Sequence, residues 1–167
     1  EVDPALLPAL ALLRTYPPMQ DWPDFLERAG VPLVFERLEG RGILGVYNPE
    51  TNRLALSSDL RTESPQVLAA ILAHETVHAI YHHRTGVRTT GRACIREEEL
   101  AFGLQAALWA HLYGPAGKPE PLTEPEREQN RILRLALDDS LDAAFITHFT
   151  YKLRCYFPDI RPQPGED

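Results

Sequence analysis

Apolar side chains recur at every third or fourth position along several stretches of the chain, a spacing typical of amphipathic helices. The strongest of these helices is expected between Ser64 and Gly86. Ser64 followed by Pro65 is an N-terminal capping signal, and Gly86 is a common terminator. Similar patterns predict helices over residues 3–14, 21–29, 95–112 and 126–156, the last with a break near residues 138–140. Helices therefore occupy both ends of the chain and most of its second half.

Between residues 31 and 57 the pattern becomes one of short, β-branched and aromatic runs, which predicts strands over residues 31–38, 42–47 and 53–57. The turn-rich segment 48–52 makes the last two a hairpin. These elements predict an α+β fold, in which a small antiparallel sheet packs on the 64–86 and 95–112 helices and further helices lie at both ends. A length of 167 residues suits one compact domain over residues 1–167.

Composition and charge exclude several classes of partner. The formal net charge is −7, and basic residues are not clustered, so a nucleic-acid partner is not expected. No apolar run approaches the roughly 18 uncharged residues of a membrane-spanning helix. Cys94 and Cys155 do not make a disulfide scaffold, although they allow a single bridge, and they leave the compartment open. Because the sequence starts at Glu1, without an apolar signal region, we expect a processed or trimmed start.

The chemistry of the chain is carried by an HExxH motif, His74-Glu75-Thr76-Val77-His78, inside the 64–86 helix. Two histidines four residues apart lie on one helix face, so both imidazoles can reach one zinc ion at about 2.1 Å. His82 repeats the spacing, but it lies about 12 Å along the helix axis from His74. It is therefore expected outside the zinc site. Glu75 is rotated away from direct ligation and is expected to activate a water molecule.

A catalytic zinc needs a third protein ligand and an open position. The segment Arg96 to Ala101 supplies Glu97, Glu98 and Glu99 about twenty residues after the motif. An HExxH helix followed by a glutamate helix resembles the gluzincin peptidases, whose glutamate is the third ligand and is often followed three positions on by a small residue. Glu98 and Ala101 match that pattern, and the resemblance as a whole covers residues 42–112. A metzincin site is not expected, because Tyr81 and Arg84 replace its glycine and histidine.

The glutamate triplet leaves alternatives open. Glu98 is the preferred ligand, Glu97 is second because it lies in line with an apolar helix face, and Glu99 is expected toward solvent. Phe102 and Gly103 occupy the region where thermolysin-like members carry an acidic residue. The acceptor that supports the His74 imidazole must therefore be another residue, which the sequence does not identify.

The resemblance implies a peptidase that holds one Zn²⁺ per chain and acts on a peptide or protein substrate, with Glu75 as general base. An edge strand of the sheet is expected to bind the substrate backbone. Candidate donors to the oxyanion are His148, Tyr151, Arg154 and Tyr156.

Cys94 lies four residues before Glu98 and would share its helix face if that helix begins early enough. Its thiolate could then occupy the open zinc position and hold the enzyme latent; the simpler interpretation is a small buried residue near a helix start.

Three further interpretations compete with a general peptidase. The strand–turn–strand before the HExxH helix is similar to that of bacterial stress-response peptidases that cleave repressors. Their glutamate motif usually continues with Ala-Asn, whereas Glu99 is followed here by Leu100. The same scaffold could also be a zinc-binding interaction module without activity. The third alternative is a helical domain with a fortuitous motif, which would bind no stoichiometric zinc. The general base favours an enzyme, because a structural zinc site is closed by four ligands and needs no Glu75.

Overall fold

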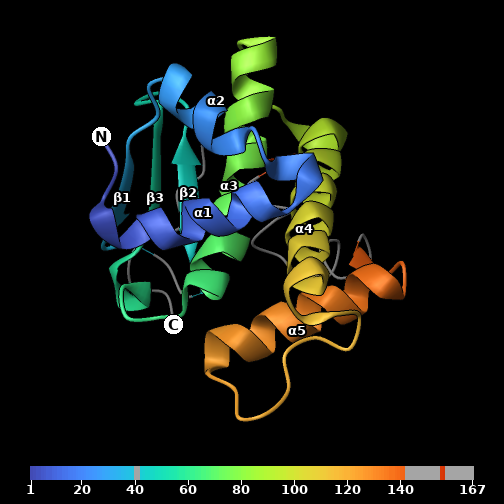
Figure 1. Cartoon of the computed structure of the whole chain (residues 1–167). Coiled ribbons are helices and arrows are strands. Elements are labelled where there is room, and N and C mark those ends of the chain that lie inside the picture. Colours follow the sequence, from blue (N-terminus) through green and yellow to red (C-terminus); the bar gives the residue numbers. More distant parts are fainter. Residues whose placement is uncertain (40–41, 142–154, 157–167) are drawn as a thin grey trace.

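The computed structural model describes residues 1–39, 42–141 and 155–156. Figure 1 shows a small sheet on one side of a central helix, α3, and further helices on the other. The helices are α1 (Leu7–Thr15), α2 (Trp22–Arg28), α3 (Pro65–Thr85), α4 (Gly91–Tyr113) and α5 (Glu124–Leu137). Short 3-10 turns are η1 (Pro4–Leu6), η2 (Pro17–Met19) and η3 (Ser58–Leu60), and the strands are β1 (Leu33–Glu36), β2 (Gly45–Asn48) and β3 (Arg53–Ser57). The α+β class is confirmed.

Helix α3 is the element against which the others pack. Its N-terminus is capped by the Ser64 hydroxyl, which accepts a hydrogen bond from the Val67 amide, and Pro65 is its first residue. Gly86 ends it in the left-handed conformation, at φ 69°. Residues 67–77 are all buried, because α1, α4 and the sheet cover different sides of the helix. The predicted bounds of this helix are confirmed.

The sheet has the strand order β1-β3-β2, with β1 parallel and β2 antiparallel to β3. The expectation of an antiparallel sheet is therefore wrong for the β1–β3 pair. Leu54, Ala55 and Leu56 make β3 the most deeply buried strand, so β3 takes the central place and β1 joins its other side. The chain reverses direction between β1 and β2 and again between β2 and β3, so β1 and β3 run the same way. Val2 pairs beside Leu33 and extends the sheet at β1, so among the described residues β2 is the edge strand on the other side.

Helix α4 begins at Gly91, four residues earlier than the predicted start at residue 95. Thr90, its N-terminal flanking residue, makes no side-chain capping bond, so the capping signal used for prediction is missing there. Helix α5 crosses α4 at the lower end of the molecule in Figure 1 and starts with a complete capping box between Thr123 and Glu126. It ends at Leu137, as the predicted break indicated.

One hydrophobic cluster joins α1, the three strands, α3, α4 and α5. Its largest buried side chains include Trp109, Leu72 and Leu108, and Trp109 donates its indole N–H to Asn130 of α5. Among the residues that the structure describes, no helix is both long and apolar enough to cross a membrane.

Candidate metal centre

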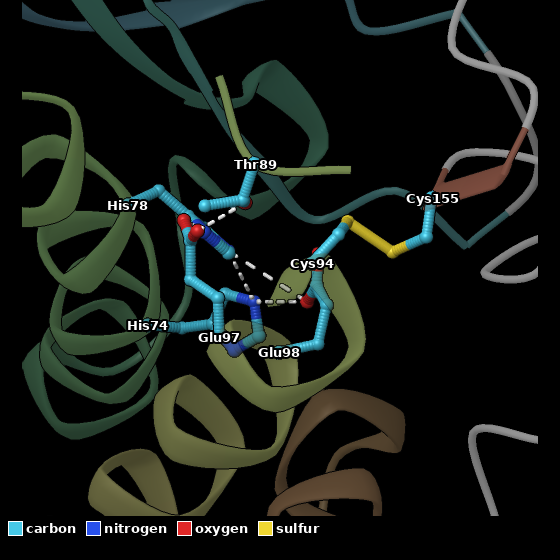
Figure 2. The surroundings of a disulfide bond; sticks show 7 residues. All are labelled: His74, His78, Thr89, Cys94, Glu97, Glu98 and Cys155. Atoms are coloured by element: carbon cyan, nitrogen blue, oxygen red, sulfur yellow. Dashed lines mark hydrogen bonds and ion pairs between the residues drawn. A yellow bond between two sulfur atoms is a disulfide. The ribbon is translucent and has the colours of Figure 1, made fainter. Parts of the chain in front are cut away.

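Three side chains from α3 and α4 converge on one point between the two helices. His74 Nε2 lies 3.2 Å from His78 Nε2, and Glu98 Oε2 lies 3.3 Å from the first and 3.6 Å from the second. The ligand atoms of the three residues all lie within 4.8 Å of one another. Figure 2 shows the two imidazoles and the carboxylate turned toward each other. The structure therefore brings Glu98, rather than Glu97 or Glu99, to the two histidines.

Both imidazoles use their other ring nitrogen for an acceptor behind them. His74 Nδ1 lies 3.0 Å from Gln105 Oε1, and the Gln105 amide in turn donates to Gln129 Oε1 of α5 at 2.7 Å. With the Gln105 amide in this orientation its oxygen is an acceptor, and His74 Nδ1 is the donor. The lone pair of His74 Nε2 is then directed toward the convergence point.

His78 is held in the same manner by a carboxylate. Its Nδ1 lies 2.6 Å from Glu97 Oε1, and the other oxygen of Glu97 accepts a hydrogen bond from the Thr89 hydroxyl. Glu97 is 6% exposed, whereas His78 and Thr89 are partly buried. Both histidines therefore present Nε2 to the same point as Glu98 Oε2, which is buried and has no hydrogen-bond partner of its own.

This arrangement needs a positive charge at its centre. Burial lowers the pKa of His78, but the carboxylates of Glu97 and Glu98 outweigh burial and raise that pKa to about 10. Burial alone would raise the pKa of Glu98, but His74 and His78 hold it well below its usual range. A proton on His78 therefore satisfies the centre in the metal-free chain, and a cation can take the same place.

The donor set fits zinc. Two imidazole nitrogens and one carboxylate oxygen are the three protein ligands of a common type of catalytic zinc site, which keeps its fourth position open. Among the described residues, His74, His78 and Glu98 are the group identified as able to hold a metal ion, and its donors come from two packed helices. Glu98 Oε2 is buried without a hydrogen-bond partner, and a bound metal ion would satisfy this oxygen.

The Glu75 carboxylate is not part of the triad and contacts the sheet. Its Oε2 accepts a hydrogen bond of 2.8 Å from the Tyr47 amide of β2, and the residue is 5% exposed. Gly45 permits this contact, because a Cβ at that position would lie 2.9 Å from Glu75 Cγ. The carboxylate therefore lies against the outer edge of β2 and binds one of its outward amides. A catalytic role for Glu75 stays a prediction.

Cys94 forms a disulfide with Cys155, which is 61 residues later. Figure 2 shows the bond beside Glu98, one helical turn before it on α4. The expectation that Cys94 carries a thiolate for the open zinc position is therefore wrong, because its sulfur is already bonded. The disulfide instead attaches the first turn of α4 to the C-terminal part of the chain.

Other predicted residues lie outside this centre. His82 is not part of the triad, as expected; its ring is 6.0 Å from that of Tyr47, and its Nδ1 is buried without a partner. Of the candidate oxyanion donors, Tyr156 is 49% exposed and lies near Gly91 at the start of α4, so its role stays a prediction. The other three candidates, His148, Tyr151 and Arg154, lie outside the described residues.

Gln105 and Glu97 are the supporting residues whose roles the sequence did not reveal. A signal for Gln105 was present: it lies seven residues, or two helical turns, after Glu98 and is a polar residue within an apolar helix face. The sequence places Glu97 in line with an apolar helix face, but its acceptor role depends on the position of His78 on another helix.

The chain was also compared with known proteins. No family model, no curated protein and no solved structure matches it. The geometry of the triad and of Glu75 is therefore what supports a function.

Proposed function

We propose that this chain is a zinc-dependent peptidase in which His74, His78 and Glu98 hold one Zn²⁺ and Glu75 is the general base. The observation that carries the proposal is the convergence of three buried electron-pair donors, with both Nδ1 atoms already engaged. The bound zinc would supply an acidified water molecule and polarise the carbonyl that is attacked.

The chain's own residues account for the remaining requirements. Glu75 follows His74 directly in the sequence and is not a member of the triad; with Oε2 held by the Tyr47 amide, its carboxylate would accept a proton and return it to the leaving amine. Among the described residues β2 is an edge strand next to this carboxylate, and the outward backbone groups other than the Tyr47 amide, which binds Glu75, would be available to an extended peptide. An extended peptide is therefore the proposed substrate, and its sequence is not specified by these contacts.

One observation favours a second candidate, a zinc-binding module without activity. The Glu75 carboxylate is buried and already accepts the Tyr47 amide, which is compatible with a purely structural role. A repressor-cleaving role is a narrower form of the peptidase proposal, and no contact among the described residues favours it.

The test measures zinc content and hydrolysis in the same preparations. We expect one zinc per wild-type chain by elemental analysis and little in Glu98→Ala, because two ligands hold zinc weakly. Hydrolysis of a quenched-fluorescent peptide library should be lost in Glu75→Gln while its zinc is kept. Glu99→Gln is the matched control, since it makes the same charge change outside the triad.

Full zinc without any Glu75-dependent hydrolysis would support the binding module. Absence of zinc from the wild type, even after supplementation, would leave neither candidate.

A further inference from the structure

Glu97 and Glu98 are adjacent in the sequence but face different parts of the metal centre. Successive helix residues are rotated by about 100°. Glu98 consequently reaches the Nε2 side of both histidines, whereas Glu97 reaches the Nδ1 side of His78. Figure 2 shows the Glu97 carboxylate beside the His78 ring and the Glu98 carboxylate on the side of the convergence point.

Both oxygens of Glu97 are occupied. Oε1 lies 2.6 Å from His78 Nδ1, and Oε2 accepts the Thr89 hydroxyl. A buried carboxylate held at both oxygens cannot also turn toward the Nε2 side without breaking two hydrogen bonds. Glu97 is therefore placed to orient a ligand and is not placed to be one.

The two histidines are supported by different chemistry. His74 donates to the neutral amide of Gln105, while His78 donates to the carboxylate of Glu97. A carboxylate acceptor gives the stronger hydrogen bond and makes the imidazole a better electron donor. His78 is therefore expected to be the more tightly oriented and more strongly binding of the two imidazoles.

Thr89 connects this support to the segment that joins α3 and α4. Thr89 precedes α4, and its hydroxyl is the donor that fixes the Glu97 rotamer from outside that helix. The first turns of α4 also carry Glu98. The segment before α4 thus contributes to the orientation of a ligand that belongs to α3.

We infer that Glu97, held by Thr89, is a positioning residue that orients His78 Nε2 toward the metal and strengthens its bond to it. This inference rests on the proposed zinc site. It adds Glu97 and Thr89 as residues that hold a zinc ligand in place without involving Glu75.

The test is the zinc dissociation constant, measured by competition with a chromophoric chelator on the full chain. We expect Glu97→Ala to bind zinc about 10–100-fold more weakly, the range known for loss of such supports. Glu97→Gln, which keeps an acceptor without the charge, should lose part of that affinity. Thr89→Val, which removes the hydroxyl, should also weaken zinc binding. Thr89→Ser, which keeps the hydroxyl, should bind zinc like the wild type. The Co²⁺-substituted proteins should show a changed visible spectrum in Glu97→Ala, which a change in packing elsewhere would not produce.

Glu99→Gln, one position from the ligand on the same helix, is the matched control and should bind zinc like the wild type. Dissociation constants for Glu97→Ala and Glu97→Gln equal to that of this control would overturn the inference, while loss of zinc in Glu98→Ala would leave the proposed function standing. Retention of zinc in Glu98→Ala with loss in Glu97→Ala would also overturn it, because Glu97 would then be the ligand. If Glu97→Ala does not fold, the Thr89 variants and Glu97→Gln decide. A wild type without zinc would overturn the proposed function itself.

Discussion

Gly45 is the residue at which the approach of β2 to α3 is most sensitive to a single methyl group. An added Cβ would lie 2.8 Å from Ile71 Cγ2, 2.9 Å from Glu75 Cγ and 3.1 Å from Glu75 Oε1. These atoms belong to the buried side of α3, which other elements hold in place. In Gly45→Ala the strand must therefore move away from the helix, or the Glu75 side chain must turn.

Overpacking of this kind costs about 1–3 kcal/mol of unfolding free energy. For a chain of this size, about 2 kcal/mol corresponds to a fall in melting temperature of roughly 4–8 °C. Hydrolysis should fall by about 100-fold, since a shift of about 1 Å in a catalytic group has that effect. Zinc affinity should change little, because the close contacts of Gly45 are with Ile71 and Glu75 and not with the triad.

Thermal unfolding of the metal-free proteins, peptide hydrolysis and zinc titration measure these three quantities. The double variant Gly45→Ala/Ile71→Ala removes the nearest methyl group, so the two changes should compensate each other by about 0.5–3 kcal/mol in a double-mutant cycle. An unfolding free energy of Gly45→Ala within about 0.5 kcal/mol of the wild type would refute the reasoning, because the strand and helix would then adjust without cost.

Three further predictions concern other parts of the chain. Gly103→Ala should raise the unfolding free energy by roughly 0.5–1 kcal/mol in a denaturant titration, because this glycine lies inside α4 and its new methyl group meets no atom within 4 Å. Replacing Cys94 and Cys155 together by serine should cost about 4 kcal/mol in the same measurement, the chain-entropy value for a loop of this length, and equal midpoints with and without reductant would contradict it. Burial raises the pKa of Glu126, but the hydrogen bond from Lys118 outweighs it and holds that pKa below its ordinary value. The stabilisation by Glu126 should therefore be present above about pH 4.5 and be lost as the pH falls through the lowered value, so Glu126→Gln should destabilise the chain more at pH 7 than at low pH.

What the sequence predicted well depends on local signals. The bounds of α3 follow from Ser64, Pro65 and Gly86, whose conformations are set by their neighbours in the chain. The convergence of His74 and His78 follows from helical spacing alone. These features need no knowledge of the rest of the fold.

What the sequence could not predict depends on contacts between distant segments. The parallel pairing of β1 with β3 depends on which strand is central, and the apolar pattern shows strands without their partners. The support of His74 comes from Gln105 and, through it, from Gln129, on two other helices. The Cys94–Cys155 bond joins residues 61 positions apart. The early start of α4 was missed for a local reason, because no side chain caps it.

The disulfide also determines how the chain responds to cleavage by a protease. The connector between α4 and α5, residues 114–123, carries exposed positions and lies inside the loop that the Cys94–Cys155 bond closes. A single cut there leaves the two parts covalently joined, so the nicked chain keeps its full mass, apart from one added water. The two fragments separate only after reduction. Any self-processing of this chain within the connector is therefore visible on a reducing gel and hidden on a non-reducing one.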